Sequence, residues 1–227
     1  MKYQEKAIIF DSGTLITLSM NDLLGMLREL KKSFNGKFII TREVENEIVF
    51  KPMKIKRFKL GAMRLKRLID DKTLEFPSSL QISDKEISRM TKEILKDANT
   101  LFISDKRPVH IIDEGESSIL ALSKLLRDKG IKNMIAMDER TTRMLCEKPD
   151  NLKNLLERKL HKKMTQQKKP NELFHKSDFI RSTELIYVAY RKGIIPKNKE
   201  LLDAMLYAAK FKGAAISSKE IKVILRM

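Results

Sequence analysis

Ala7-Ile8-Ile9-Phe10-Asp11-Ser12-Gly13 is an apolar segment that runs directly into a carboxylate and then into turn-forming residues. Open α/β sheets bind ligands outside the carboxyl ends of their strands, so an acid that ends a buried strand faces a crevice. Asp also commonly ends strands and caps the next helix, so one such residue does not define a site. Acids likewise follow, within a few residues, the apolar segments Ile39-Ile40, Ile111-Ile112 and Met134-Ile135-Ala136-Met137. The sequence therefore predicts several strands whose ends bring carboxylates to one place.

Apolar residues at helical spacing separate these predicted strands. Residues 15–34 predict two short helices or one helix interrupted at Asn21-Asp22. A basic amphipathic helix is predicted at 54–70 and an edge strand at 73–76. Further helices are expected at about 83–100, 116–130, 138–146, 179–192, 201–211 and 218–225. The alternation predicts an α/β fold, namely a three-layer α/β/α domain with a central, mainly parallel sheet.

Composition restricts the class of protein. The chain has 227 residues with 42% hydrophobic content, enough for a folded domain with additions. Its single Cys146 cannot form an internal disulfide, and no Cys and His spacing suggests a zinc site. The first apolar run is too short for a signal peptide or a membrane span. We therefore expect a cytoplasmic protein without a membrane partner.

Charge is distributed unevenly along the chain. The net charge is +17, from 47 basic and 30 acidic residues. Residues 1–50 and 113–146, which hold the candidate carboxylates, are neutral, and the basic excess lies at 51–75, 147–176 and 177–227. We interpret the chain as a single domain over 1–227 with a basic helical addition near 51–75 and a basic inserted arm, expected to be mobile, near 147–176. This pattern suits a polyanion held beside an acidic centre, although Lys-rich helices also occur simply as solvated faces.

Four acids follow the predicted strands closely enough to meet at one crevice: Asp11, Glu47, Glu116 and Asp138. Neighbouring carboxylates repel one another, which raises their pKa values unless a cation neutralises them. Oxygen ligands without Cys or His favour Mg²⁺ or Mn²⁺. On a phosphodiester, such an ion orients water and stabilises charge on the attacking and leaving oxygens.

These segments resemble the motifs of the PIN-domain (PilT N-terminus-like) nucleases, nearest to a prokaryotic and archaeal branch of that family. The similar segments are Ile8 to Leu15, Val44 to Ile48, Gly115 to Leu122 and Ala136 to Arg143, and the likeness covers most of 7–146 and 177–225. The resemblance implies that Asp11, Glu116 and Asp138 are metal ligands and that Glu47 completes the catalytic site. Glu43 and Glu45 compete with Glu47 for the second motif. Asp113 and Glu139 stay open as auxiliary ligands, although the role of a helix cap or a surface charge is favoured over that of a primary ligand.

The resemblance implies a metal-dependent endoribonuclease acting on structured RNA, such as ribosomal or transfer RNA. Two alternatives stay open: a catalytically inactive PIN-like module that binds RNA or protein, and the toxin of a toxin–antitoxin pair. A homodimer and an antitoxin or other protein partner also stay open. The residues expected to contact RNA are Lys54, Lys56, Arg57, Arg64, Lys66, Arg67, Lys162, Lys163, Lys168 and Lys169, together with Arg140 and Arg143 beside Asp138.

The same first motif also resembles haloacid-dehalogenase-type phosphatases, in which the Asp is a nucleophile. That family needs a second Asp two positions later as a general acid, and Gly13 stands there. The phosphatase hypothesis therefore lacks a group that its mechanism needs.

Overall fold

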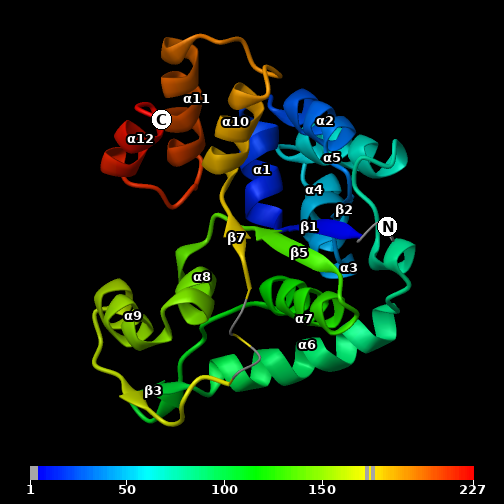
Figure 1. The fold of residues 1–227 in the computed structure, drawn as a ribbon. Coiled ribbons are helices and arrows are strands. Elements are labelled where there is room, and N and C mark those ends of the chain that lie inside the picture. The colour runs from blue at the N-terminus through cyan, green and yellow to red at the C-terminus, as the bar shows by residue number, and fades with distance from the viewer. Residues whose placement is uncertain (1–4, 172–173, 175–176) are drawn as a thin grey trace.

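The computed structural model describes residues 5–171, 174 and 177–227, and its centre is a parallel β-sheet (Figure 1). The strand order within the described residues is β2-β1-β5-β7. The strands are β1 (Lys6–Phe10), β2 (Lys37–Ile39), β5 (Lys132–Ala136) and β7 (Phe179–Ile180). All three strand pairs are parallel, and Ile9 of β1 lies opposite Ile39 on one side and Ile135 on the other. The predicted parallel sheet is confirmed.

Helices cover both faces of this sheet (Figure 1). The α7 helix packs on β1 and β5 from one face and against α6, while α1, α2 and α10 lie together on the other face. The helices are α1 (Ser12–Met20), α2 (Leu24–Ser33), α3 (Arg42–Glu45), α4 (Lys51–Met53), α5 (Lys59–Asp70), α6 (Asp84–Asn99), α7 (Glu114–Asp128), α8 (Arg140–Glu147), α9 (Leu152–Leu160), α10 (Ser182–Arg191), α11 (Lys199–Phe211) and α12 (Ser218–Ile224). A π-helical turn, η1 (Asn46–Phe50), joins α3 to α4, and η2 (Pro77–Leu80) and η3 (Pro149–Asn151) are short 3₁₀ turns. The three-layer α/β/α prediction is confirmed.

The first strand is apolar from Ala7 to Phe10 because helices cover the sheet on both faces. Ile9 and Phe10 are fully buried, and the Phe10 ring lies 5.0 Å from that of Phe38 on β2. Fully burying an aliphatic or aromatic side chain contributes roughly 1.5 to 3 kcal/mol to stability. Charged residues stand at the two ends of this apolar run, Lys6 before it and Asp11 after it.

A smaller antiparallel sheet stands apart from the central one. Its strand order is β4-β3-β6, formed by β3 (Phe102–Ser104), β4 (Arg107–Pro108) and β6 (Thr165–Gln166). Figure 1 shows β3 beyond one end of α6, far from α1 and β1. The hairpin between β3 and β4 turns through Asp105 and Lys106, both in the left-handed region.

The described part of 147–176, predicted as a mobile inserted arm, contains a helix and a strand and contributes to the core. Helix α9 packs against α8, and β6 pairs with β3. Leu152, Leu156 and Met164 are buried, as is Phe174. Because these four apolar side chains are spread through a basic stretch, its Lys-rich composition conceals the part that enters the core.

Other local predictions also require correction. Residues 111–112 form no strand, and Glu116 instead follows a loop that Asn99 holds through hydrogen bonds to the Ile111 and Ile112 backbone. The predicted helix at 54–70 begins only at Lys59, after a turn. The predicted edge strand at 73–76 is reduced to a single β-bridge between Ile39 and Glu75. The segment 179–192, predicted as a helix, begins with strand β7. Within residues 5–171, 174 and 177–227, no helix has the length and apolarity required to span a membrane.

Candidate metal centre

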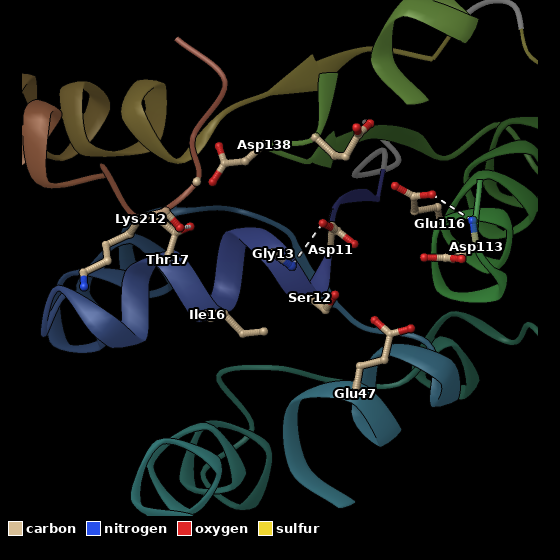
Figure 2. A pocket seen from close by; sticks show the side chains of 12 residues that line it. Asp11, Ser12, Gly13, Ile16, Thr17, Glu47, Asp113, Glu116, Asp138 and Lys212 are labelled. Atoms are coloured by element: carbon tan, nitrogen blue, oxygen red, sulfur yellow. Dashed lines mark hydrogen bonds between the residues drawn. The ribbon is translucent and has the colours of Figure 1, made fainter. Parts of the chain in front are cut away.

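The four acids singled out from the sequence all line one cavity of about 330 Å³ at the carboxyl edge of the sheet. Figure 2 shows the carboxylates of Asp11, Glu47, Glu116 and Asp138 around this space. They come from the end of β1, from η1, from the first turn of α7 and from the segment after β5. The cavity therefore brings together four segments that are far apart in the chain.

Asp11 is both a helix cap and a buried acid of the cavity. Its Oδ2 accepts a hydrogen bond of 3.1 Å from the Gly13 backbone N–H, which caps α1 as the ordinary role of Asp would suggest. The side chain is nevertheless buried, and the nearby Glu116 and Glu47 carboxylates repel its charge. The pKa of Asp11 is raised to about 7, mainly by burial and secondly by repulsion from Glu116.

Glu116 has a comparable environment at the start of α7. Its Oε2 accepts a hydrogen bond of 2.9 Å from the Asp113 backbone N–H within a capping box. Burial raises the pKa of Glu116 to about 7, and the Glu139 carboxylate adds to the rise. A carboxylate used only as a helix cap does not require this degree of burial beside other acids.

Asp138 lies after β5 and connects the cavity to α10. Its Oδ1 accepts a hydrogen bond of 2.8 Å from the Ser182 backbone N–H, while its buried Oδ2 has no hydrogen-bond partner among the described residues. Burial raises the pKa of Asp138, opposed in part by the Ser182 backbone N–H, by the Ser182 and Thr17 side chains and by the Arg143 charge. A buried carboxylate oxygen without a partner is costly, which is what a metal or ligand position accounts for.

Among the three competing acids near α3, Glu47 is the one that lines the cavity. Glu45 forms an ion pair of 2.9 Å with Arg42, and Glu43 lines a neighbouring cleft. The π-turn directs Glu47 toward the start of α7, where a Cβ placed on Gly115 would lie 2.6 Å from its Oε1. Gly115 therefore leaves room for the Glu47 carboxylate, and π-turns of this kind are frequent at functional sites.

The cavity has further lining residues that the sequence did not assign to it as primary groups. Asp113 begins the α7 capping box, and its Oδ1 lies 2.7 Å from His110 Nε2. The Glu139 side chain caps α8 by accepting from the Thr142 backbone N–H. Both residues also line the cavity, so their role as auxiliary ligands stays a prediction. Thr17 and Lys212 were missed. Lys212 follows α11, far along the chain, and Figure 2 shows its side chain directed away from the carboxylates. No motif marks such a residue, because only tertiary packing brings it to the rim.

The donor set suits a hard divalent cation, but it is not gathered at a single point. Within the described part of the chain, no three His, Cys, Asp or Glu side chains converge closely enough to hold a metal ion. The lining acids offer only oxygen ligands, which Mg²⁺ and Mn²⁺ prefer, and Asp138 Oδ2 lacks a partner. Uncompensated carboxylates repel one another, so a cation bound among these acids would relieve that repulsion.

The residues expected to contact RNA lie in separate regions. Lys54, Lys56 and Arg57 lie in the turn before α5, and Arg64, Lys66 and Arg67 lie on α5. Lys162, Lys163, Lys168 and Lys169 lie beside β6, toward the opposite end of the molecule in Figure 1. All ten side chains are exposed, although Lys66, Lys162 and Lys168 form ion pairs with Asp70, Asp105 and Asp97. The two basic segments therefore do not form one continuous surface.

Arg140 and Arg143 lie on α8, immediately after Asp138. Arg143 forms an ion pair of 3.5 Å with Glu147, and no ion pair joins either arginine to Asp11, Glu116 or Asp138 in the described residues. The Arg143 charge nevertheless lowers the pKa of Asp138, so this arginine offsets part of the negative charge of the cavity without forming an ion pair there.

Comparison with protein-family models, with curated proteins and with solved structures finds no match to this chain. Function is accordingly inferred from the cavity and its residues.

Proposed function

We propose that the protein is a Mg²⁺- or Mn²⁺-dependent endoribonuclease that acts on structured RNA in the cytoplasm. The observation that supports this most strongly is the meeting of Asp11, Glu47, Glu116 and Asp138 at one cavity, three of them with raised pKa values. The PIN-domain resemblance of the same four positions is consistent with this proposal. A net charge of +17 supports a polyanionic substrate.

The chain's own residues would hold and tune the reaction site. Asp11, Glu116 and Asp138 would hold the metal ion, and Glu47, seated against Gly115, would complete its surroundings. When bound, such an ion lowers the pKa of water and offsets charge on the phosphodiester oxygens. With pKa values near 7, Asp11 and Glu116 would release protons on binding the cation, so activity is expected to rise from pH 6 to pH 8.

Cleavage of labelled total RNA tests the proposal, with added Mg²⁺, added Mn²⁺ or chelator. Wild type is expected to cleave only with metal, and Glu116→Gln is expected to be inactive. Glu114→Gln is the matched control, since Glu114 is the exposed acid two residues earlier on the same helix. Cleavage that survives the chelator, or that Glu116→Gln retains, would refute the proposed metal mechanism.

Divalent cations are expected to stabilise the folded protein at pH 8. A cation present at a hundred times its dissociation constant adds about 2.7 kcal/mol, or roughly 5 to 10 °C in Tm for a chain of this length. Thermal unfolding with and without Mn²⁺ measures the shift, and Asp11→Asn should reduce it strongly. An unchanged Tm at saturating Mn²⁺ would argue for the binding-module alternative.

Gly115→Ala is expected to lower cleavage by about 10- to 100-fold with little effect on stability. The added Cβ would displace the Glu47 carboxylate, whereas Ala is otherwise favourable inside a helix. Gly25→Ala on α2 is the control, since a Cβ there meets nothing within 4 Å. Full activity in Gly115→Ala would exclude a positioned Glu47 from the mechanism.

A further inference from the structure

A second cavity, of about 570 Å³, lies beside the carboxylate cavity and is lined by α8 and the chain from α11 to α12. We propose that it is a phosphate-binding subsite for the RNA strand next to the cleaved bond. This proposal rests on the ribonuclease function proposed above and on the expectation that Arg140 and Arg143 contact RNA, and it adds the cavity in which the neighbouring phosphate is held. Three observations support it: its charge, a desolvated guanidinium and its position.

The lining is predominantly basic. Its cations are Arg140, Arg143, Lys148, Arg181 and Lys210. Two acids, Glu147 and Glu220, also line it, and they pair with Arg143 and Arg181. Positive charge therefore remains uncompensated by the lining carboxylates, in contrast to the acidic cavity next to it.

Arg143 gives the cavity a built donor group. Its side chain is 18% exposed, and its one ion pair in the described residues, to Glu147, is a long contact of 3.5 Å. The Nε atom is buried and has no hydrogen-bond partner among the described residues. An Arg donor without an acceptor is costly to bury, so the protein leaves this guanidinium incompletely satisfied, and a phosphate in the cavity would compensate its charge.

The two cavities adjoin along the same two segments of chain. Asp138 and Glu139 line the first cavity and Arg140 the second, while Lys212 and Gly213 line the first and Ala214 and Ala215 the second. The Ala215 backbone N–H donates to the Asp138 carbonyl at 3.3 Å, which fixes the two segments together. An RNA strand with one phosphate at the carboxylates thus has the second cavity within reach of a neighbouring phosphate. A guanidinium fork matches phosphate geometry, which favours this ligand.

Binding of a labelled RNA hairpin in chelator tests the subsite without cleavage. Arg143→Gln is expected to weaken binding about tenfold and to reduce the salt dependence by about one phosphate contact. Arg140→Gln tests the same cavity with an exposed side chain whose replacement leaves the core intact. Arg28→Gln on α2 is the control of equal charge change, since Arg28 pairs with Asp71 at another surface.

Weaker binding and a smaller salt slope in both cavity variants, with Arg28→Gln unchanged, would support the subsite. Wild-type affinity and slope in both cavity variants, or no RNA binding by the wild type, would overturn it. These outcomes are independent of the cleavage assay. Lost metal-dependent cleavage with this binding pattern intact would refute the nuclease and keep the phosphate site.

Discussion

Asp11→Asn is expected to lose metal-dependent cleavage by at least about a hundredfold and to be more stable than the wild type at pH 8 in chelator. The loss follows because an amide is a poor ligand for a hard cation. The fold should persist because the Asn side-chain oxygen can still accept the Gly13 backbone N–H and cap α1. RNA binding should be retained, since the change removes a negative charge from a site that receives phosphates.

The gain in stability follows from the pKa of Asp11, which is raised from 3.8 to about 7. A carboxyl whose pKa is higher in the folded than in the unfolded state binds its proton more tightly when folded. It therefore destabilises the fold increasingly as the pH rises from about 4 to 7. A shift of this size corresponds to roughly 2 to 4 kcal/mol, allowing for the cost of burying the amide. The variant and the wild type should differ by this amount at pH 8 and much less near pH 4.

Urea unfolding in chelator measures the stability difference between Asp11→Asn and wild type at pH 4.5 and at pH 8. Asp22→Asn is a suitable control because Asp22 is exposed and has a positive φ that Asn adopts readily. Equal stability of Asp11→Asn and wild type at pH 8 would show that burial of this carboxylate costs the fold nothing.

Arg181→Gln is expected to lower the free energy of unfolding by about 2 to 3 kcal/mol, or roughly 5 to 10 °C in Tm. The Arg181 side chain is 12% exposed and lies 2.7 Å from both Glu184 and Glu220. It also donates to the Ala215 carbonyl, so it connects α10 to α12 and to the chain that borders both cavities. Because the two glutamates are partly exposed, the expected loss of unfolding free energy is smaller than for a fully buried ion pair.

Thermal unfolding at pH 7 checks this loss, with Arg28→Gln as an exposed ion-pair control. Against the effect of burial, hydrogen bonds from Arg181 and Ser217 hold the pKa of Glu220 at about 2. Glu220 is therefore charged in the folded protein at pH 5, and the loss of stability should persist there. A Tm within 2 °C of wild type would contradict the role of Arg181 in attaching α12.

The sequence predicted the parallel sheet and the acids at its edge because both depend on strong local signals. Buried parallel strands are continuously apolar, so Ile8 to Phe10 and Met134 to Ala136 were recognisable, as was the acid that ends each of them. Capping residues such as Thr41 and Ser83 likewise mark helix starts in the sequence. Glu116 was found through its helix, although the loop before it forms no strand.

Other features were not predictable because they depend on tertiary contacts. Strand β7 has two residues and is defined by its pairing with β5, so the helical periodicity that follows conceals it. The π-turn at Asn46–Phe50 has no sequence signature, yet it directs Glu47 rather than Glu43 or Glu45 to the cavity. The second cavity joins α8 to residues about 70 positions later, a distance over which single-sequence patterns give no information.

The most direct test compares wild type with Asp138→Asn on the same labelled RNA, with Mn²⁺ and with chelator, while binding is followed in parallel. The amide side chain of this variant retains an acceptor for the Ser182 backbone N–H and replaces the carboxylate oxygen that lacks a partner, so the fold should be unchanged. The proposed function predicts Mn²⁺-dependent cleavage by wild type, its loss in Asp138→Asn, and equal RNA binding by both. Tight, salt-sensitive binding without cleavage under any metal would contradict it and identify an RNA-binding module.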